Sequence, residues 1–152
     1  MTSCDPDQMP TLSAEGGAVA QIIGQTIQGM EIPIGRVFSS EYCRTRETVQ
    51  YMGLGPVTAT PAIMNMRAVE FLGGQDAAIY RARGALSTPP RAVTNSVFVA
   101  HGNLLLAVSG AYTGEAEAAI FLPHGNGEFQ MVAQLAPQDW ELFGRKFAMD
   151  EE

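Results

Sequence analysis

The sequence contains few cysteines and histidines, the side chains that most often bind zinc. It has two cysteines, Cys4 and Cys43, and two histidines, His101 and His124. The cysteines show no Cys-x-x-Cys spacing and have no histidine cluster nearby, which argues against a zinc site or any other metal centre. The sequence leaves open whether Cys4 and Cys43 form a disulfide. It therefore also leaves open whether the protein lies in an oxidising or a reducing compartment.

Basic residues are also scarce. Nine Lys and Arg stand against sixteen Asp and Glu, which gives a formal net charge of -7 and a pI of about 4.7. A chain this acidic has no general attraction for nucleic acid or for an anionic membrane surface, so neither is expected as a partner. Any phosphate that it binds must be held by a few local arginines, which act against the repulsion from the net negative charge of the chain.

The sequence has no apolar run near the ~18 residues that a membrane span requires. Residues 1–11 (MTSCDPDQMPT) lack the basic and apolar regions of a signal peptide and are expected to form a loop. As given, the chain is therefore expected in the cytoplasm. A periplasmic location is the alternative if an upstream signal has been lost.

What the sequence does contain is enough apolar material, 46% of its 152 residues, for one core, so residues 1–152 are expected to form a single domain. Helical periodicity alternates with short apolar runs until residue 110. The predicted order is helix 14–28, strand 34–39, helix 41–52, strand 57–62, helix 75–86, strand 96–100 and helix 104–109. Strands 116–122 and 128–135 follow as a hairpin around residues 123–127, where Asn126-Gly127 is a tight-turn signal, and residues 139–147 are expected to be helical. This order favours an α/β fold: a layered, mostly parallel sheet with helices on both faces and a C-terminal β-hairpin.

Side chains that could bind an anion follow two of these strands. The segment VFSSEYCRTRET (residues 37–48) places Arg44 in the first turn of a helix that follows a strand. The segment NSVFVAHGN (residues 95–103) places His101 directly after another strand. Open α/β sheets bind ligands at the carboxyl ends of their strands, helix N-termini attract anions, and a guanidinium group matches two phosphate oxygens.

Together with LSAEG (residues 12–16), which opens the first helix, these segments resemble the histidine phosphatase (phosphoglycerate mutase-like) superfamily, in particular its small bacterial branch. The resemblance covers about residues 12–140. It implies a phosphoglycerate mutase-like fold and hydrolysis of a phosphomonoester through a phosphohistidine, without a cofactor. Arg44 would bind phosphate, and His101 would be the second pocket histidine, both phosphate-binding and catalytic. The substrate would be a phosphorylated small molecule or a phosphohistidine protein.

The sequence departs from this pattern at its start. In the family an Arg-His-Gly triplet, which carries the nucleophilic histidine, ends a first strand ahead of the LSAEG-type segment. The eleven residues before Leu12 contain no histidine or arginine, so we expect an N-terminally truncated domain that lacks the triplet and the first strand. Phosphatase activity is accordingly expected to be impaired. The alternatives are a pseudoenzyme that binds phosphate or another anion without turnover, and a structural remnant of the fold.

The missing first strand has a further consequence. The resemblance places it between the strands around Val37 and Val97. Without it, these two strands are expected to pair directly, or the chain is expected to form a homo-oligomer through an exposed sheet edge, with stability below that of a full-length relative.

Four other residues are interpreted without a functional role. Arg46 is expected at the surface and His124 in an exposed turn. Trp140 is expected to be a packing anchor, and Glu70 is not assigned as a general acid. The methionines on either side of Asn65 are interpreted as ordinary packing.

Overall fold

A computed structural model describes residues 12–150 of the chain. Its elements are α1 (Ala14–Gly29), β1 (Ile34–Ser39), α2 (Cys43–Met52), β2 (Val57–Ala59), η1 (Pro61–Ile63), η2 (Met66–Leu72), α3 (Gln75–Ser87), β3 (Asn95–Val99), α4 (Gly102–Ser109), β4 (Ala118–Gly125), β5 (Glu128–Leu135) and α5 (Pro137–Asp150), where η marks a 3₁₀-helix. The loop predicted over residues 1–11 lies outside the described residues. No helix within the described part is long and apolar enough to cross a membrane.

The strands form a three-stranded parallel sheet, ordered β2-β1-β3, and a separate antiparallel hairpin of β4 and β5. In the sheet, Val37 of β1 lies opposite Val57 of β2 and Val97 of β3. Strands β1 and β3 therefore pair directly, which confirms the first of the two arrangements expected for them. The predicted α/β class with a C-terminal hairpin is also confirmed.

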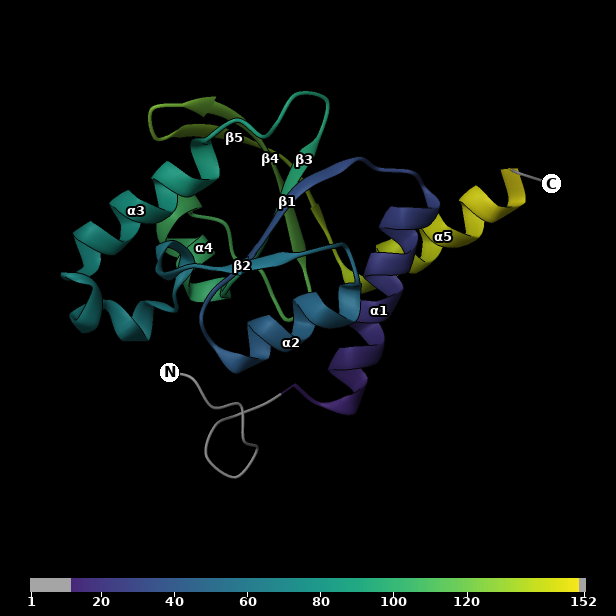
Figure 1. Cartoon of the computed structure of the whole chain (residues 1–152), viewed down its shortest axis with the longest axis horizontal. Coiled ribbons are helices and arrows are strands. Elements are labelled where there is room, and N and C mark those ends of the chain that lie inside the picture. The colour runs from purple at the N-terminus through teal and green to yellow at the C-terminus, as the bar shows by residue number, and fades with distance from the viewer. Residues whose placement is uncertain (1–11, 151–152) are drawn as a thin grey trace.

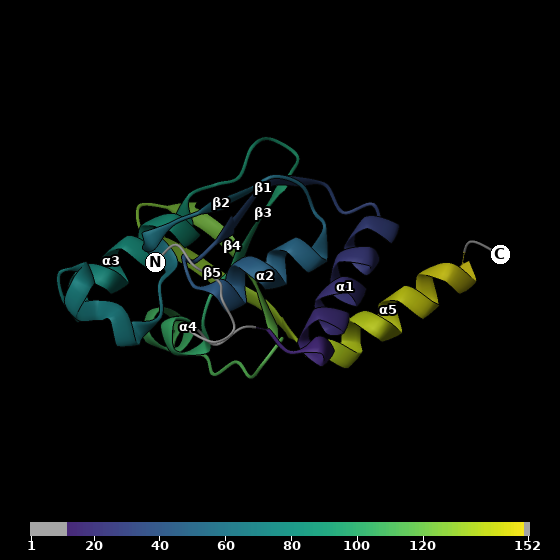
Figure 2. The same ribbon diagram turned by 60° about the horizontal axis from the view of Figure 1, so that its bottom comes forward.

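Helices cover both faces of the sheet (Figure 1). Helices α1, α2 and α5 gather on one side, where Ala20, Ile27, Met52 and Trp140 form a buried cluster. Helices α3 and α4 lie on the other, where Ile63, Ala82, Leu104 and Val108 form a second cluster. The second view shows the same division, with α3 and α4 at one end and α1 and α5 at the other (Figure 2). Trp140 is buried in the first cluster, in line with its predicted role as a packing anchor.

Several predicted boundaries are wrong. Strand β3 is shifted by one residue, α4 begins two residues earlier than predicted, β4 begins two residues later, and α5 is longer at both ends. The strand expected over 57–62 stops at Ala59, because Thr60 caps the 3₁₀-turn that begins at Pro61. The helix expected from 41 begins at Cys43. The hairpin turn is shorter than expected, because Asn126 and Gly127 both adopt positive φ and make a two-residue turn. Residues 123–125 consequently belong to β4.

Among the described strands, none forms a ladder with the second edge of β3. An open edge of this kind is a template for pairing with another chain. We therefore expect the protein to self-associate as its concentration rises, which light scattering coupled to size-exclusion chromatography would measure. A monomer at every concentration would contradict this prediction.

Candidate functional site

The loop between β1 and α2 brings a buried serine to the carboxyl end of the sheet. Ser40 follows the last residue of β1, and its backbone N–H donates to the carbonyl of Val99 at 3.1 Å, which extends the pairing with β3 by one residue. Its side chain is buried. The backbone N–H of Glu41, the next residue, donates to Met64 Sδ at 3.3 Å.

His101 reaches the same place from β3. Its backbone is extended (φ -134°, ψ 142°), and it forms the N-cap of α4. The next residue must be small, because a Cβ at Gly102 would lie 2.8 Å from the carbonyl oxygen of Thr113. This close approach packs the start of α4 against the segment that follows the helix.

Three residues from two segments surround the His101 ring. Its Nε2 lies 2.8 Å from Ser40 Oγ, and its Nδ1 lies 3.3 Å from Asn65 Nδ2. The Tyr42 ring packs edge-on against it, with 4.7 Å between the centroids. Ser40 Oγ continues the network to Thr45 Oγ1 at 2.6 Å. Both ring nitrogens of His101 are therefore engaged by protein groups.

The surroundings of His101 keep it neutral. Burial lowers its pKa from 6.5 to about 4, and the positive charge of Arg44 contributes to the lowering. Protonation would place a second cation beside Arg44 in a poorly solvated position. At neutral pH the imidazole is consequently uncharged, and Arg44 supplies the positive charge of the site.

Arg44 lies two residues after Tyr42, whose ring packs against His101, so both predicted residues lie at the same end of the sheet. Arg44 itself is exposed in the first turn of α2. Arg44 thus follows the carboxyl end of β1 and His101 that of β3, while convergence of their side chains on one cleft stays a prediction. Because parallel strands end at the same edge of a sheet, two motifs far apart in the sequence converge.

Two helix N-termini also meet at this point. Helix α2 begins after Tyr42 and α4 after His101, and neither N-cap residue makes a side-chain capping hydrogen bond. The contact between the Tyr42 and His101 rings places these two N-termini side by side. Because N-terminal N–H groups carry partial positive charge, an anion would be favoured here.

Other residues considered from the sequence lie elsewhere or make no contact with His101. His124 is exposed, but it lies near the end of β4 and not in a turn, which corrects the predicted location. Glu70 is exposed in η2, and Arg46 is half-buried on α2, less exposed than predicted.

The sequence interpretation missed Asn65 as a neighbour of His101. No pattern around it could have signalled this role, because the contact spans 36 positions.

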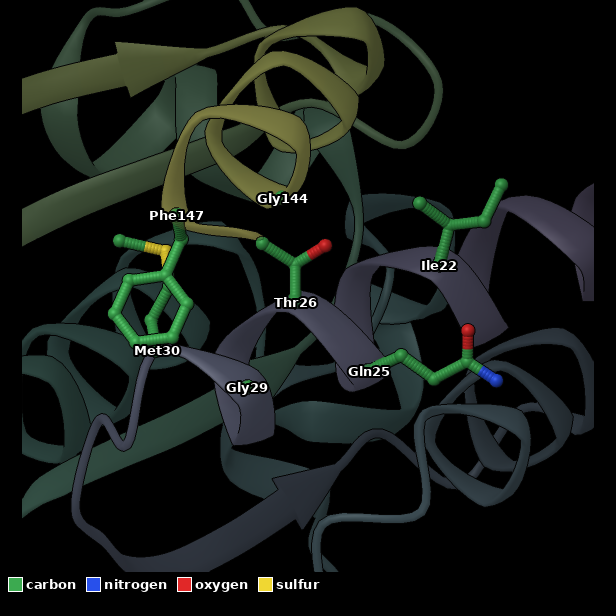
Figure 3. A pocket seen from close by; sticks show the side chains of 7 residues that line it. All are labelled: Ile22, Gln25, Thr26, Gly29, Met30, Gly144 and Phe147. Atoms are coloured by element: carbon green, nitrogen blue, oxygen red, sulfur yellow. The ribbon is translucent and has the colours of Figure 1, made fainter. Parts of the chain in front are cut away.

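Two further features do not add to the site. A shallow groove between α1 and α5 is lined by Thr26, Met30, Gly144 and Phe147 among others, and Figure 3 shows the Phe147 ring over Met30. Helices α1 and α5 lie at one end of the molecule and α4, whose N-cap is His101, lies at the other (Figure 2). Within residues 12–150, no three His, Cys, Asp or Glu side chains form a group that could hold a metal ion.

Comparison with known proteins shows a likeness in fold. No protein-family model matches the sequence, and no curated protein matches it either. Among solved structures, the fold is similar to that of the protein histidine phosphatase SixA complexed with tungstate, with a TM-score of 0.63 and 16% sequence identity over 91% of this chain and 92% of that chain. At this identity the likeness shows a histidine phosphatase-like fold and nothing finer.

Proposed function

We propose that the protein binds the phosphoryl group of a phosphorylated small molecule or of a phosphohistidine protein between Arg44 and His101, and that hydrolysis through a phosphohistidine is impaired. One observation carries the proposal: a guanidinium, a neutral imidazole and two helix N-termini without side-chain caps meet at the carboxyl ends of β1 and β3.

Arg44 is the principal anchor in this proposal. A guanidinium can donate two parallel hydrogen bonds to two oxygens of one phosphoryl group. The N-termini of α2 and α4 add favourable dipoles. The net charge of -7 opposes any anion, so affinity must depend on these local groups. The tungstate in the SixA structure supports the proposal, because tungstate is a tetrahedral oxyanion like phosphate.

His101 is a poor replacement for a missing nucleophile. Attack on phosphorus needs a ring nitrogen with a lone pair directed at the substrate. In this site Nε2 faces Ser40 and Nδ1 faces Asn65. The arrangement suits a group that holds an oxyanion better than one that forms a covalent intermediate, which favours binding over turnover. A structural remnant that binds nothing is the competing candidate.

Arg44→Ala is expected to weaken phosphate binding about 10- to 100-fold, because hydrogen bonds to charged groups contribute ~1.5–3 kcal/mol. Calorimetric or NMR titration with inorganic phosphate at fixed ionic strength would measure this. Arg46→Ala removes the same charge from the same helix and is the matched control, with an expected change within about threefold.

Two outcomes would contradict the proposal. Wild-type protein that does not bind phosphate would favour the structural remnant. Equal losses in Arg44→Ala and Arg46→Ala would show that phosphate senses only the overall charge and does not occupy the site around His101.

A further inference from the structure

The side-chain amide of Asn65 is held in one orientation by a backbone N–H group, which can donate a hydrogen bond but cannot accept one. It is buried and forms the N-cap of η2, where its Oδ1 accepts the backbone N–H of Arg67 at 2.9 Å. The same Oδ1 lies 2.7 Å from Asn103 Nδ2. Because a backbone N–H can only donate, Oδ1 must be the atom near Arg67. The Nδ2 group of Asn65 must therefore be the atom that faces His101 Nδ1.

Asn103 supports this orientation and is fixed in the same way. Its Oδ1 accepts the backbone N–H of Met66 at 3.2 Å, so its Nδ2 is the atom directed at Asn65. Two consecutive backbone N–H groups at the start of η2, those of Met66 and Arg67, thus determine the orientation of both side-chain amides. Neither assignment depends on the protonation of His101.

We propose that Asn65, supported by Asn103, is a positioning residue that fixes the tautomer of His101. The Nδ2 group of Asn65 can only donate, so Nδ1 of His101 must accept. The proton of the neutral ring then resides on Nε2, which donates to Ser40 Oγ at 2.8 Å.

The other end of the network leads independently to the same tautomer. Thr45 Oγ1 lies 2.9 Å from the carbonyl oxygen of Tyr42, which can only accept, so the hydroxyl of Thr45 donates to it. Thr45 must then accept from Ser40 at 2.6 Å. With its proton used, Ser40 Oγ can only accept, and it faces Nε2 of His101 and the N–H of Tyr42. A proton on Nε2 satisfies every one of these groups.

This tautomer argues against a nucleophilic role for His101. At the carboxyl end of β1 the ring carries an N–H donor, which Ser40 Oγ accepts, and no lone pair. A nucleophile needs the opposite tautomer at the same atom. This consequence rests on the function proposed above, but the tautomer itself does not.

Nitrogen NMR of the imidazole rings tests the assignment directly. In the wild-type protein at neutral pH, His101 is expected as the neutral tautomer with its proton on Nε2. Asn65→Asp replaces the donor with a carboxylate of the same shape, which attracts a proton to Nδ1. We expect this variant to raise the pKa of His101 by more than about one unit and to place a proton on Nδ1.

Two controls isolate the effect. Asn95→Asp adds the same charge at an exposed asparagine whose Nδ2 donates to the carbonyl of Pro33, and it should leave the His101 signals within about 0.3 units of the wild-type pKa. His124, which is exposed, reports any general change of the protein in the same spectra. The wild-type spectrum alone remains decisive if Asn65→Asp does not fold.

Wild-type His101 with its proton on Nδ1 would overturn the proposal. So would an Asn65→Asp variant whose His101 behaves as in Asn95→Asp. Parallel phosphate titrations separate this inference from the proposed function: a tautomer that responds to Asn65→Asp in a protein that binds no phosphate would support the positioning role and refute only the binding site.

Discussion

Hydrolysis of p-nitrophenyl phosphate by this chain is expected to be on the order of 10⁴ to 10⁶ slower than by a histidine phosphatase that carries the Arg-His-Gly triplet, assayed under the same conditions. Loss of a covalent nucleophile commonly costs a factor of this size and leaves the contribution of binding and electrostatics. His101 does not compensate, because both of its ring nitrogens are engaged by Ser40 and Asn65.

The His101→Ala variant provides the control for this assay. If the residual rate comes only from electrostatic stabilisation, removal of the imidazole should lower it by no more than about 10²- to 10³-fold, the usual loss for one oxyanion-stabilising donor. Rapid turnover that disappears in His101→Ala would show that His101 is the nucleophile. In that case the impaired activity proposed for the site would be wrong.

The largest effect on stability is expected at the crossing of α1 and α2. A Cβ placed on Gly24 would lie 1.9 Å from the carbonyl oxygen of Met52, and the backbone of α2 cannot move away without opening the first cluster. Gly24→Ala is therefore expected to lower the free energy of unfolding by about 3 kcal/mol or more, even after the better helix propensity of alanine contributes ~1 kcal/mol in its favour. Urea denaturation would measure the change.

Gly29 in the same helix is the matched control. Nothing lies within 4 Å of a Cβ built at this position. Gly29→Ala should consequently leave the stability unchanged or raise it by up to about 1 kcal/mol. A Gly24→Ala protein at least as stable as Gly29→Ala would contradict the close approach of the two helices.

Much of the fold follows from local patterns in the chain. The apolar runs around Val37 and Val97 predict buried strands, and their placement between helical segments predicts a layered α/β sheet. The same order predicts that Arg44 and His101 lie at one edge, because parallel strands that alternate with helices all point the same way. Asn126-Gly127 predicts the hairpin, since few residue pairs tolerate two successive positive φ angles.

Other features depended on contacts between distant segments. The direct pairing of β1 with β3 was one of two predicted arrangements, and strand order depends on the energy of the whole sheet. Asn65 had no recognisable pattern, because its role arises from the backbone N–H of Arg67 on one side and His101 on the other. The acceptor or donor character of a histidine nitrogen is set by its partners in space. The position of His101 could thus be read from the residues around it, whereas its protonation required the folded chain.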